Sequence, residues 1–360
     1  MKPWIRLPAP PGGLLLAAAS GVATGATFSP YGGAILPFLA FAPLGAALAA
    51  RGQRPPGTQT SSPVTLGFTA AFVAHGIGLY WMIPALAWRT SLAVPLYLLV
   101  LSLIGMLAGV ACQGAVVLHR RWGWPIPLAL AACWTGSEWV AAHVPGFSYA
   151  WLNAGGSLAW HPALAAGSEV LGARFLTVWT VGVGAWIGAV AARWVCGRGG
   201  LRRVGRRGAL ALDLAALPAV AGAVRHATLG DEGPDMRIVA VQPGGNPAEP
   251  APDGGLERWL EPIRAASRDA SPALAVFPER FIAAPLRELG GAEATLAGER
   301  AAAFAEALDL PVLTGALDVA RTPGDTLWYN AAFLQFPDGR LSRAYRKTRL
   351  VPGLEGSGWW

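Results

Sequence analysis

The sequence predicts a polytopic α-helical membrane bundle followed by a soluble α/β domain. Three observations support this fold class. Apolar residues make up 53% of the 360 residues and charged residues 14%, which is a low charge content for a soluble protein. Acidic residues are almost absent before residue 200, where only Glu138 and Glu169 occur, but are frequent from Asp231 onward. Beyond residue 235, short β-type runs alternate with helical patterns, as in α/β folds.

The first part, residues 1–226, is predicted to be a membrane domain with about seven transmembrane helices, because each crossing needs about 20 apolar residues. Candidate spans lie near Gly12–Phe28, Gly33–Ala50, Val64–Trp81, Leu92–Leu118, Pro125–Ala142, Ala165–Val195 and Ala209–Val224. The last is the weakest, because Asp213 interrupts it and a charge at mid-span costs a few kcal/mol. Closely spaced glycines such as Gly182, Gly184 and Gly188 let helix backbones approach, so we expect a compact bundle.

Arginines mark the expected orientation of the bundle. Counted from a cytoplasmic N-terminus, the basic residues gather in loops on one side of the membrane. These are Lys2 and Arg6, Arg51 and Arg54, Arg120 and Arg121, and the cluster Arg198–Arg207. The positive-inside rule makes that side cytoplasmic and places everything after about His226 outside the cytoplasm. The cluster follows a span and carries no aromatic platform, which favours a role in topology and predicts no nucleic-acid partner.

The second part, residues 235–360, is predicted from alternating strand and helix patterns. Strands are expected at Arg237–Gln242, Ala273–Phe277, Pro311–Ala316 and Ala331–Phe336, with helices at Leu256–Ala270 and Ala292–Leu308. A Pro337–Gly339 turn then leads toward Tyr345.

Two residues of this part are candidates for chemistry. Glu279 directly follows an apolar strand, at the carboxyl end where α/β folds place reactive groups. It fits a general base, and the alternative is a solvated Glu or one paired with Arg280. Lys347 lies in a basic stretch that by itself fits a solvated surface. If the two converge, the carboxylate can take a proton while the ammonium stabilises the oxyanion of a tetrahedral intermediate.

Four motifs occur in the order seen in nitrilase-superfamily domains. They are Val276-Phe277-Pro278-Glu279, Leu313-Thr314-Gly315, Tyr329-Asn330-Ala331-Ala332, and Tyr345-Arg346-Lys347 running on to Leu350-Val351-Pro352. Combined with the membrane spans, this order resembles the apolipoprotein N-acyltransferase family. Gly76–Trp81 and Phe147–Leu152 are similar to signatures of that family, so Trp81 and Trp151 are possible substrate-pocket residues.

The resemblance implies a nitrilase-like (α-β-β-α) domain with a Glu-Lys-Cys triad, in which Glu279 and Lys347 are catalytic and Glu355 is supporting. The family's nucleophilic Cys lies some tens of residues beyond the lysine. The last Cys of this sequence is Cys196 and the sequence ends at Trp360. We therefore expect a C-terminally incomplete, partial domain that is inactive as given. No cofactor or metal is expected.

The implied activity transfers an acyl chain from a phospholipid to the N-terminal diacylglyceryl-cysteine of lipoproteins. The expected partners are the phospholipid donor, the diacylated apolipoprotein and membrane lipid. The expected location is the bacterial inner (cytoplasmic) membrane, with the nitrilase-like domain on its periplasmic or outer side. Alternatives are a membrane-tethered nitrilase-type amidase and a non-catalytic, lipid-binding pseudo-enzyme. A transporter would need ionisable groups at mid-membrane, for which Glu138, Glu169, Arg174 and Asp213 are the candidates.

Overall fold

The computed structural model describes residues 11–29, 33–51, 61–87, 90–144, 148–195, 201–230, 233, 235–243, 255–268, 271–288, 294–322, 325–348 and 350. The chain divides into two compact units, which are described separately. Unit 1 comprises Met1–Gly230 and unit 2 comprises Asp231–Trp360.

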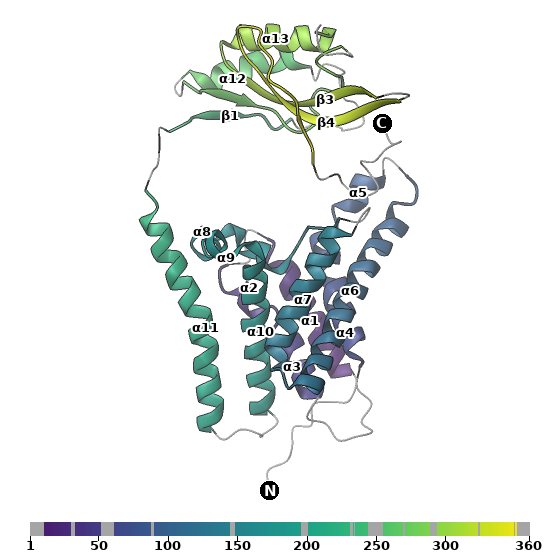
Figure 1. The fold of residues 1–360 in the computed structure, drawn as a ribbon, viewed down its shortest axis with the longest axis vertical. Coiled ribbons are helices and arrows are strands. Elements are labelled where there is room, and N and C mark those ends of the chain that lie inside the picture. Colours follow the sequence, from purple (N-terminus) through teal and green to yellow (C-terminus); the bar gives the residue numbers. More distant parts are fainter. Residues whose placement is uncertain are drawn as a thin grey trace. The chain divides into compact units, whose positions relative to one another are not determined.

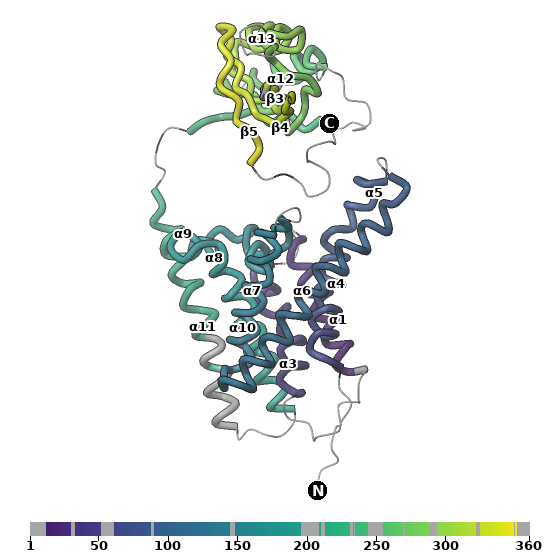
Figure 2. Tube along the Cα trace, turned by 45° about the vertical axis from the view of Figure 1, so that its right-hand side comes forward, coloured from purple at the N-terminus to yellow at the C-terminus, as the bar shows by residue number. Residues whose placement is uncertain are grey.

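Unit 1 is helical, and its long helices run side by side (Figure 1, Figure 2). Its described helices are α1 (Pro11–Ala26), α2 (Leu36–Leu39), α3 (Ala42–Arg51), α4 (Pro63–Gly78), α5 (Met82–Ala87), α6 (Ala93–Trp122), α7 (Ile126–His143), α8 (Pro162–Ala165), α9 (Ser168–Leu171), α10 (Ala173–Val195) and α11 (Leu201–Thr228). A 3₁₀ segment, η1, covers Ala154–Trp160. Fully buried leucines such as Leu44, Leu101 and Leu130 form the centre of its core.

Glycines set the closest helix contacts of unit 1. A methyl group added at Gly188 of α10 would overlap the Ala42 carbonyl oxygen of α3. One added at Gly45 of α3 would lie 2.5 Å from the Ala185 Cα of α10. Such backbone approach is how helices associate where hydrophobic drive between them is weak. By contrast, a methyl group added at Gly182 would lie 3.6 Å from the Ala131 Cβ, an ordinary van der Waals contact.

Two of the expected spans are interrupted. The segment 33–50 divides into α2 and α3 next to Pro43, which has no backbone N–H and cannot continue the helical hydrogen-bond ladder. Ser20 bonds the Ala40 carbonyl at this break, with a 2.5 Å contact from its hydroxyl. The segment 165–195 divides at Gly172, whose φ of +76° ends α9 before α10 begins.

By length and composition, two helices within the described ranges are suited to cross a membrane, α6 and α10. The apolar helices at Gly12–Ala26, Leu36–Arg51 and Pro63–Gly78 are shorter. At 1.5 Å per residue, 16 residues span about 24 Å, less than the hydrocarbon thickness of about 30 Å. The expectation of about seven spans is therefore not reached by this measure.

Three specific contacts attach helix α11 to the rest of unit 1, beside the packing of Ala215 and Ala219. Pro218 lies inside α11 and cannot bond the Leu214 carbonyl, and the Trp179 indole N–H of α10 donates to that carbonyl instead, at 2.8 Å. A methyl group at Gly222 would overlap the Ala163 carbonyl of α8. Arg225 forms a bidentate ion pair with Glu169 of α9, with N···O distances of 2.6 and 2.7 Å. The last two contacts attach its C-terminal half to α8 and α9.

Unit 2 contains one mixed sheet with the strand order β1-β2-β3-β4-β5. The strands are β1 (Ile238–Ala240), β2 (Leu274–Val276), β3 (Val312–Thr322), β4 (Asp325–Gln335) and β5 (Tyr345–Arg346). The first three are parallel, and β3, β4 and β5 pair antiparallel. The segment η2 (Leu256–Trp259) with helix α12 (Leu260–Ser267), and helix α13 (Leu296–Leu308), connect the parallel strands and cover one face of the sheet (Figure 1).

The β3–β4 hairpin is longer than the sequence pattern indicates. Strands were expected at 311–316 and 331–336, but β3 continues to Thr322 and β4 begins at Asp325. Charged side chains such as Asp318 interrupt the apolar run in the half of the hairpin near its turn. The backbone pairing of β3 with β4 nevertheless continues through this half. Tyr345–Arg346, expected only to follow a turn, forms β5. The described residues contain this one sheet with its helices on one face, which is one α-β half of the expected α-β-β-α arrangement.

Candidate active site

Glu279 lies in a turn immediately after β2, and this turn rests on strand β3. The N–H of Gly315 donates to the Pro278 carbonyl at 3.3 Å, and the N–H of Ile282 donates to the Gly315 carbonyl at 3.0 Å. A side chain at Gly315 would overlap the Arg280 backbone nitrogen and lie 2.7 Å from the Glu279 Cα. Arg280 itself has a φ of +53°, a strained value for a non-glycine residue. Glycine at 315 therefore lets β3 hold the turn that presents Glu279.

The structure brings Lys347 to Glu279. The Lys347 Nζ lies 2.8 Å from the Glu279 Oε1, although 68 residues separate them in the sequence. Lys347 follows β5, and its backbone N–H donates to the Asn330 carbonyl of β4 at 2.8 Å. The Asn330 side-chain amide donates to the same carboxylate oxygen, Oε1. One carboxylate oxygen thus accepts from both an ammonium and an amide.

Asn330 was not expected as a site residue, although the motif containing it was noted. It is 3% exposed in the middle of a strand, where a polar side chain must find a partner. A polar residue among the apolar residues of β4 was the one signal in the sequence that marked it. Its partner could not be inferred, because the pairing of β2, β3 and β4 was not known.

The chemistry of the site combines an accessible carboxylate with a sheltered cation. The Glu279 side chain is 56% exposed and that of Lys347 is 25% exposed, so a substrate can reach the carboxylate. Lysines are rare in this chain: of its 28 Lys and Arg residues, only Lys2 and Lys347 are lysines. A lysine in contact with a carboxylate offers a compact, mobile ammonium that an arginine does not. This arrangement fits proton transfer combined with oxyanion stabilisation.

The other predicted residues lie elsewhere. Glu355 lies outside the described residues. Trp81 and Trp151 belong to unit 1, where their rings contact each other edge to face at a centroid distance of 5.9 Å. Both are partly exposed, at 46% and 38%. The Tyr149 ring packs edge to face on Trp151 at 5.8 Å, so the three form one aromatic cluster.

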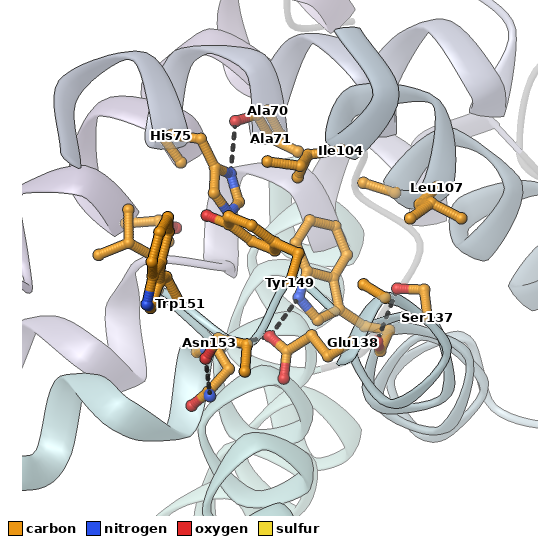
Figure 3. Close-up of a pocket in the computed structure, with 18 of the residues that line it drawn as sticks. Ala70, Ala71, His75, Ile104, Leu107, Ser137, Glu138, Tyr149, Trp151 and Asn153 are labelled. Carbon is orange, nitrogen blue, oxygen red and sulfur yellow. Dashed lines mark hydrogen bonds between the residues drawn. The ribbon is translucent and has the colours of Figure 1, made fainter. Parts of the chain in front are cut away.

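Trp151 and Tyr149 line a pocket of unit 1 whose walls are mainly apolar (Figure 3). His75, Glu138 and Asn153 add polar groups to its wall. Figure 3 shows the Tyr149 ring next to His75, and the ring centroids are 5.8 Å apart. The pocket is therefore amphipathic, as sites for molecules with a long apolar part are.

Glu138 fixes the segment that carries these aromatic residues. Its Oε1 accepts from the Ala154 N–H at 2.8 Å and from the Trp134 indole at 3.2 Å. Its Oε2 accepts from the Thr177 hydroxyl at 2.9 Å, and Arg174 lies 3.5 Å away. The sequence offered Glu138 as a candidate for a transport path, but here its carboxylate joins α7, α10 and the start of η1.

No group of three or more His, Cys, Asp or Glu side chains in the described ranges is placed to hold a metal ion. Of the cysteines, Cys112 and Cys133 are described, and both are free thiols of unit 1. The site chemistry of unit 2 thus rests on Glu279, Lys347 and Asn330 among the residues whose positions are described.

The sheet unit, with its Glu and Lys in contact, is of the carbon–nitrogen hydrolase class. A model of that class, described as carbon-nitrogen hydrolase, matches residues 237–358. A second model, described as the apolipoprotein N-acyltransferase N-terminal domain, matches residues 20–204, which is just over half of the chain. The chain belongs to the apolipoprotein N-acyltransferase family. No curated protein matches it.

Proposed function

We propose that this chain belongs to an enzyme that transfers an acyl chain from a phospholipid to the N-terminal diacylglyceryl-cysteine of lipoproteins. In the first step a thiolate attacks the ester carbonyl of the phospholipid, a thioester forms, and the lysophospholipid leaves. In the second step the α-amine of the lipoprotein attacks the thioester, an amide forms, and the thiol is released. Each step passes through a tetrahedral intermediate with an oxyanion.

Glu279 is proposed as the general base that takes the proton of the thiol and, later, of the attacking amine. Lys347 is proposed to stabilise the oxyanion, with Asn330 holding the Glu279 carboxylate in place. The observation that carries the proposal is the 2.8 Å contact between the Lys347 Nζ and the Glu279 Oε1, in a chain matched by both family models. The exposed Glu279 carboxylate is open to a substrate from outside the site.

The lipid substrate requires a site near a bilayer. At about 0.8 kcal/mol per methylene, moving a long acyl chain into water would cost on the order of 10 kcal/mol. We propose that unit 1 is multi-pass, in the bacterial inner membrane, with unit 2 on the periplasmic or outer side. Helices α6 and α10 support crossing, and helices α1, α3, α4 and α7 share a hydrophobic core with them. The aromatic cluster of Trp81, Tyr149 and Trp151 is proposed to contact the lipid.

The reaction also needs a thiolate, and all three cysteines of the sequence precede unit 2. The test therefore uses two forms, the chain as given and the chain extended by its native downstream coding sequence. Each is expressed in cells depleted of their own N-acyltransferase. We expect rescue of growth by the extended form and loss of that rescue with Glu279→Gln, which keeps the shape of the side chain and removes its basicity.

Rescue by the extended Glu279→Gln form would contradict the role of Glu279. Rescue by neither unmutated form would contradict acyl transfer to lipoproteins. A second candidate, amide hydrolysis by a membrane-tethered enzyme, is favoured by one observation, the carbon–nitrogen hydrolase match over residues 237–358. Release of ammonia or an amine from small amides by the purified extended form, without lipoprotein acylation, would support that candidate.

A further inference from the structure

Arg346 of β5 reaches across the sheet to two other strands. Its Nε donates to the Asp318 Oδ2 of β3 at 2.6 Å. Its guanidinium lies over the Tyr329 ring of β4, 3.9 Å from the ring centroid. Asp318 and Tyr329 are directly opposite each other in the β3–β4 ladder. We call these three residues, Asp318, Tyr329 and Arg346, the three-strand clamp.

The clamp holds a strand whose own ladder is short, and the segment before it bonds β4 separately, where the Ser342 N–H donates to the Leu334 carbonyl at 2.9 Å. Strand β5 pairs with β4 through two residues only, with Arg346 opposite Ala331 and Tyr345 opposite Ala332. Lys347 directly follows, and its N–H continues the pairing by bonding the Asn330 carbonyl. Successive residues of a strand point to opposite faces of a sheet. Arg346 therefore binds the clamp on one face while Lys347 reaches Glu279 from the other.

We propose that the three-strand clamp is a positioning device for Lys347. Asp318 and Arg346 fix the end of β5, and this fixes the ammonium against the Glu279 carboxylate. A catalytic group must be held within about 0.5 Å of its working position by groups that are themselves fixed by packing and hydrogen bonds. The clamp supplies such contacts next to Lys347. The catalytic meaning of the clamp rests on the proposed function, whereas its effect on Lys347 does not.

The clamp is not a source of overall stability. The Arg346 side chain is 43% exposed and that of Asp318 is 21% exposed, and exposed ion pairs contribute little to stability. Loss of the clamp should therefore move Lys347 without moving the thermal unfolding temperature. This separates a positioning role from a merely structural one.

The composition of the chain provides a direct readout. Lys2 and Lys347 are its two lysines, so a trace amount of acetic anhydride labels two side-chain amines that peptide mass spectrometry distinguishes. Lys2 serves as the internal reference. An ammonium held against Glu279, on a side chain that is 25% exposed, is shielded from the reagent. The ratio of Lys347 to Lys2 labelling at fixed pH therefore reports the Lys347–Glu279 contact.

The test compares variants of residues 1–360 purified in detergent. Glu279→Gln removes the carboxylate that contacts Lys347 and sets the upper reference for the labelling ratio. Asp318→Asn and Arg346→Gln remove the clamp, and Asp318→Glu keeps its carboxylate. Asp338→Asn is the matched control, because Asp338 and Arg340 form another exposed ion pair, with the same 2.6 Å distance, away from Lys347.

We expect Asp318→Asn and Arg346→Gln to raise the labelling ratio about fivefold toward that of Glu279→Gln, the factor for one lost hydrogen bond. Asp318→Glu should restore most of the wild-type ratio, and Asp338→Asn should leave it unchanged. Unfolding temperatures should stay at the wild-type value in all of these variants.

Three results would overturn the proposal. They are an unchanged ratio in both clamp variants, an equal rise in Asp338→Asn, and an unchanged ratio in Glu279→Gln. The labelling needs no enzymatic activity, so it is independent of the complementation test. If extended Glu279→Gln still rescues growth while the clamp variants release Lys347, the proposed function fails and the positioning of Lys347 stands.

Discussion

At the scale of single residues, the site depends on a glycine that takes no part in chemistry. Gly315 lies against the backbone of Pro278, Glu279 and Arg280, and the turn and β3 bond each other there. The backbone atoms of the turn cannot move aside as a flexible side chain can. The position of the Glu279 carboxylate thus depends on the absence of a side chain at residue 315.

Gly315→Ala is expected to destabilise unit 2 by about 1–3 kcal/mol, the usual cost of overpacking, and to displace Glu279. The measurement is thermal unfolding of residues 1–360 in detergent, followed by the Lys347 labelling ratio, which should rise. Gly136→Ala is the control, because its added methyl meets nothing within 4 Å. Unchanged unfolding and labelling in Gly315→Ala would show that the turn adapts without strain.

Sequence reasoning found two of the three residues that meet in the site. Glu279 was marked by its place after an apolar strand, and Lys347 by the motif around it. Asn330 was missed because its role depends on which strands are neighbours, which residue types alone do not specify. Arg346 was quoted as part of a motif, but its contact with Asp318 spans three strands and needs the register of the sheet.

At the scale of elements, a helix–helix contact compensates for a proline. Pro218 leaves the Leu214 carbonyl of α11 without a donor in its own helix, and the Trp179 indole of α10 supplies one. Trp179 is 5% exposed, so the bond is shielded from competition by water. The carbonyl that has no donor within α11 thus accepts a hydrogen bond that attaches α11 to α10.

Trp179→Phe should cost about 1–3 kcal/mol, because it leaves this carbonyl without a partner. In a Pro218→Ala background the same change should cost about 1 kcal/mol less, because residue 218 then donates to Leu214 within the helix. Unfolding in mixed micelles with increasing SDS gives the four values of this double-mutant cycle. Trp194→Phe is the control on the same helix, since Trp194 is 65% exposed. Equal costs of Trp179→Phe in both backgrounds would contradict the compensation.

The sequence predicted where most elements lie but not where they break. Apolar runs located the helices of unit 1, because such a run can be seen in the sequence whichever helices pack against each other. The break beside Pro43 and the one at Gly172 were missed because both lie inside apolar runs. The outer half of the β3–β4 hairpin was missed for the opposite reason. Its charged residues interrupt the apolar pattern, although Leu317, Val319 and Trp328 share one face of the hairpin there.

At the scale of the whole molecule, the predicted division between residues 226 and 235 can be set beside the observed one at Gly230 and Asp231. That prediction rests on the change from few to many acidic residues in this stretch. The number of membrane crossings was not readable in the same way. Several helices are near the length limit for a span, so composition alone does not decide which of them cross.

The orientation of the two units is a prediction that labelling can check. Cys112, Cys133 and Cys196 are replaced by alanine, and one cysteine is introduced at exposed Arg343 of unit 2 or at exposed Arg121 of α6. In intact spheroplasts a membrane-impermeant maleimide should label Arg343→Cys at once. It should label Arg121→Cys only after lysis, because basic loops stay in the cytoplasm. The reverse pattern would contradict the proposed topology, and labelling of both before lysis would contradict a membrane-spanning unit 1.

The proline in α11 also gives that helix a preferred place to bend. A helix lacks one rung of its hydrogen-bond ladder at a proline, and stiffness is lowest there. Gly222 and the Arg225–Glu169 pair clamp the half of α11 beyond this point to α8 and α9. Bending at Pro218 would therefore move the half of α11 before it relative to α8 and α9. The Trp179–Leu214 bond joins α11 to α10 one turn before this proline, so it opposes such bending.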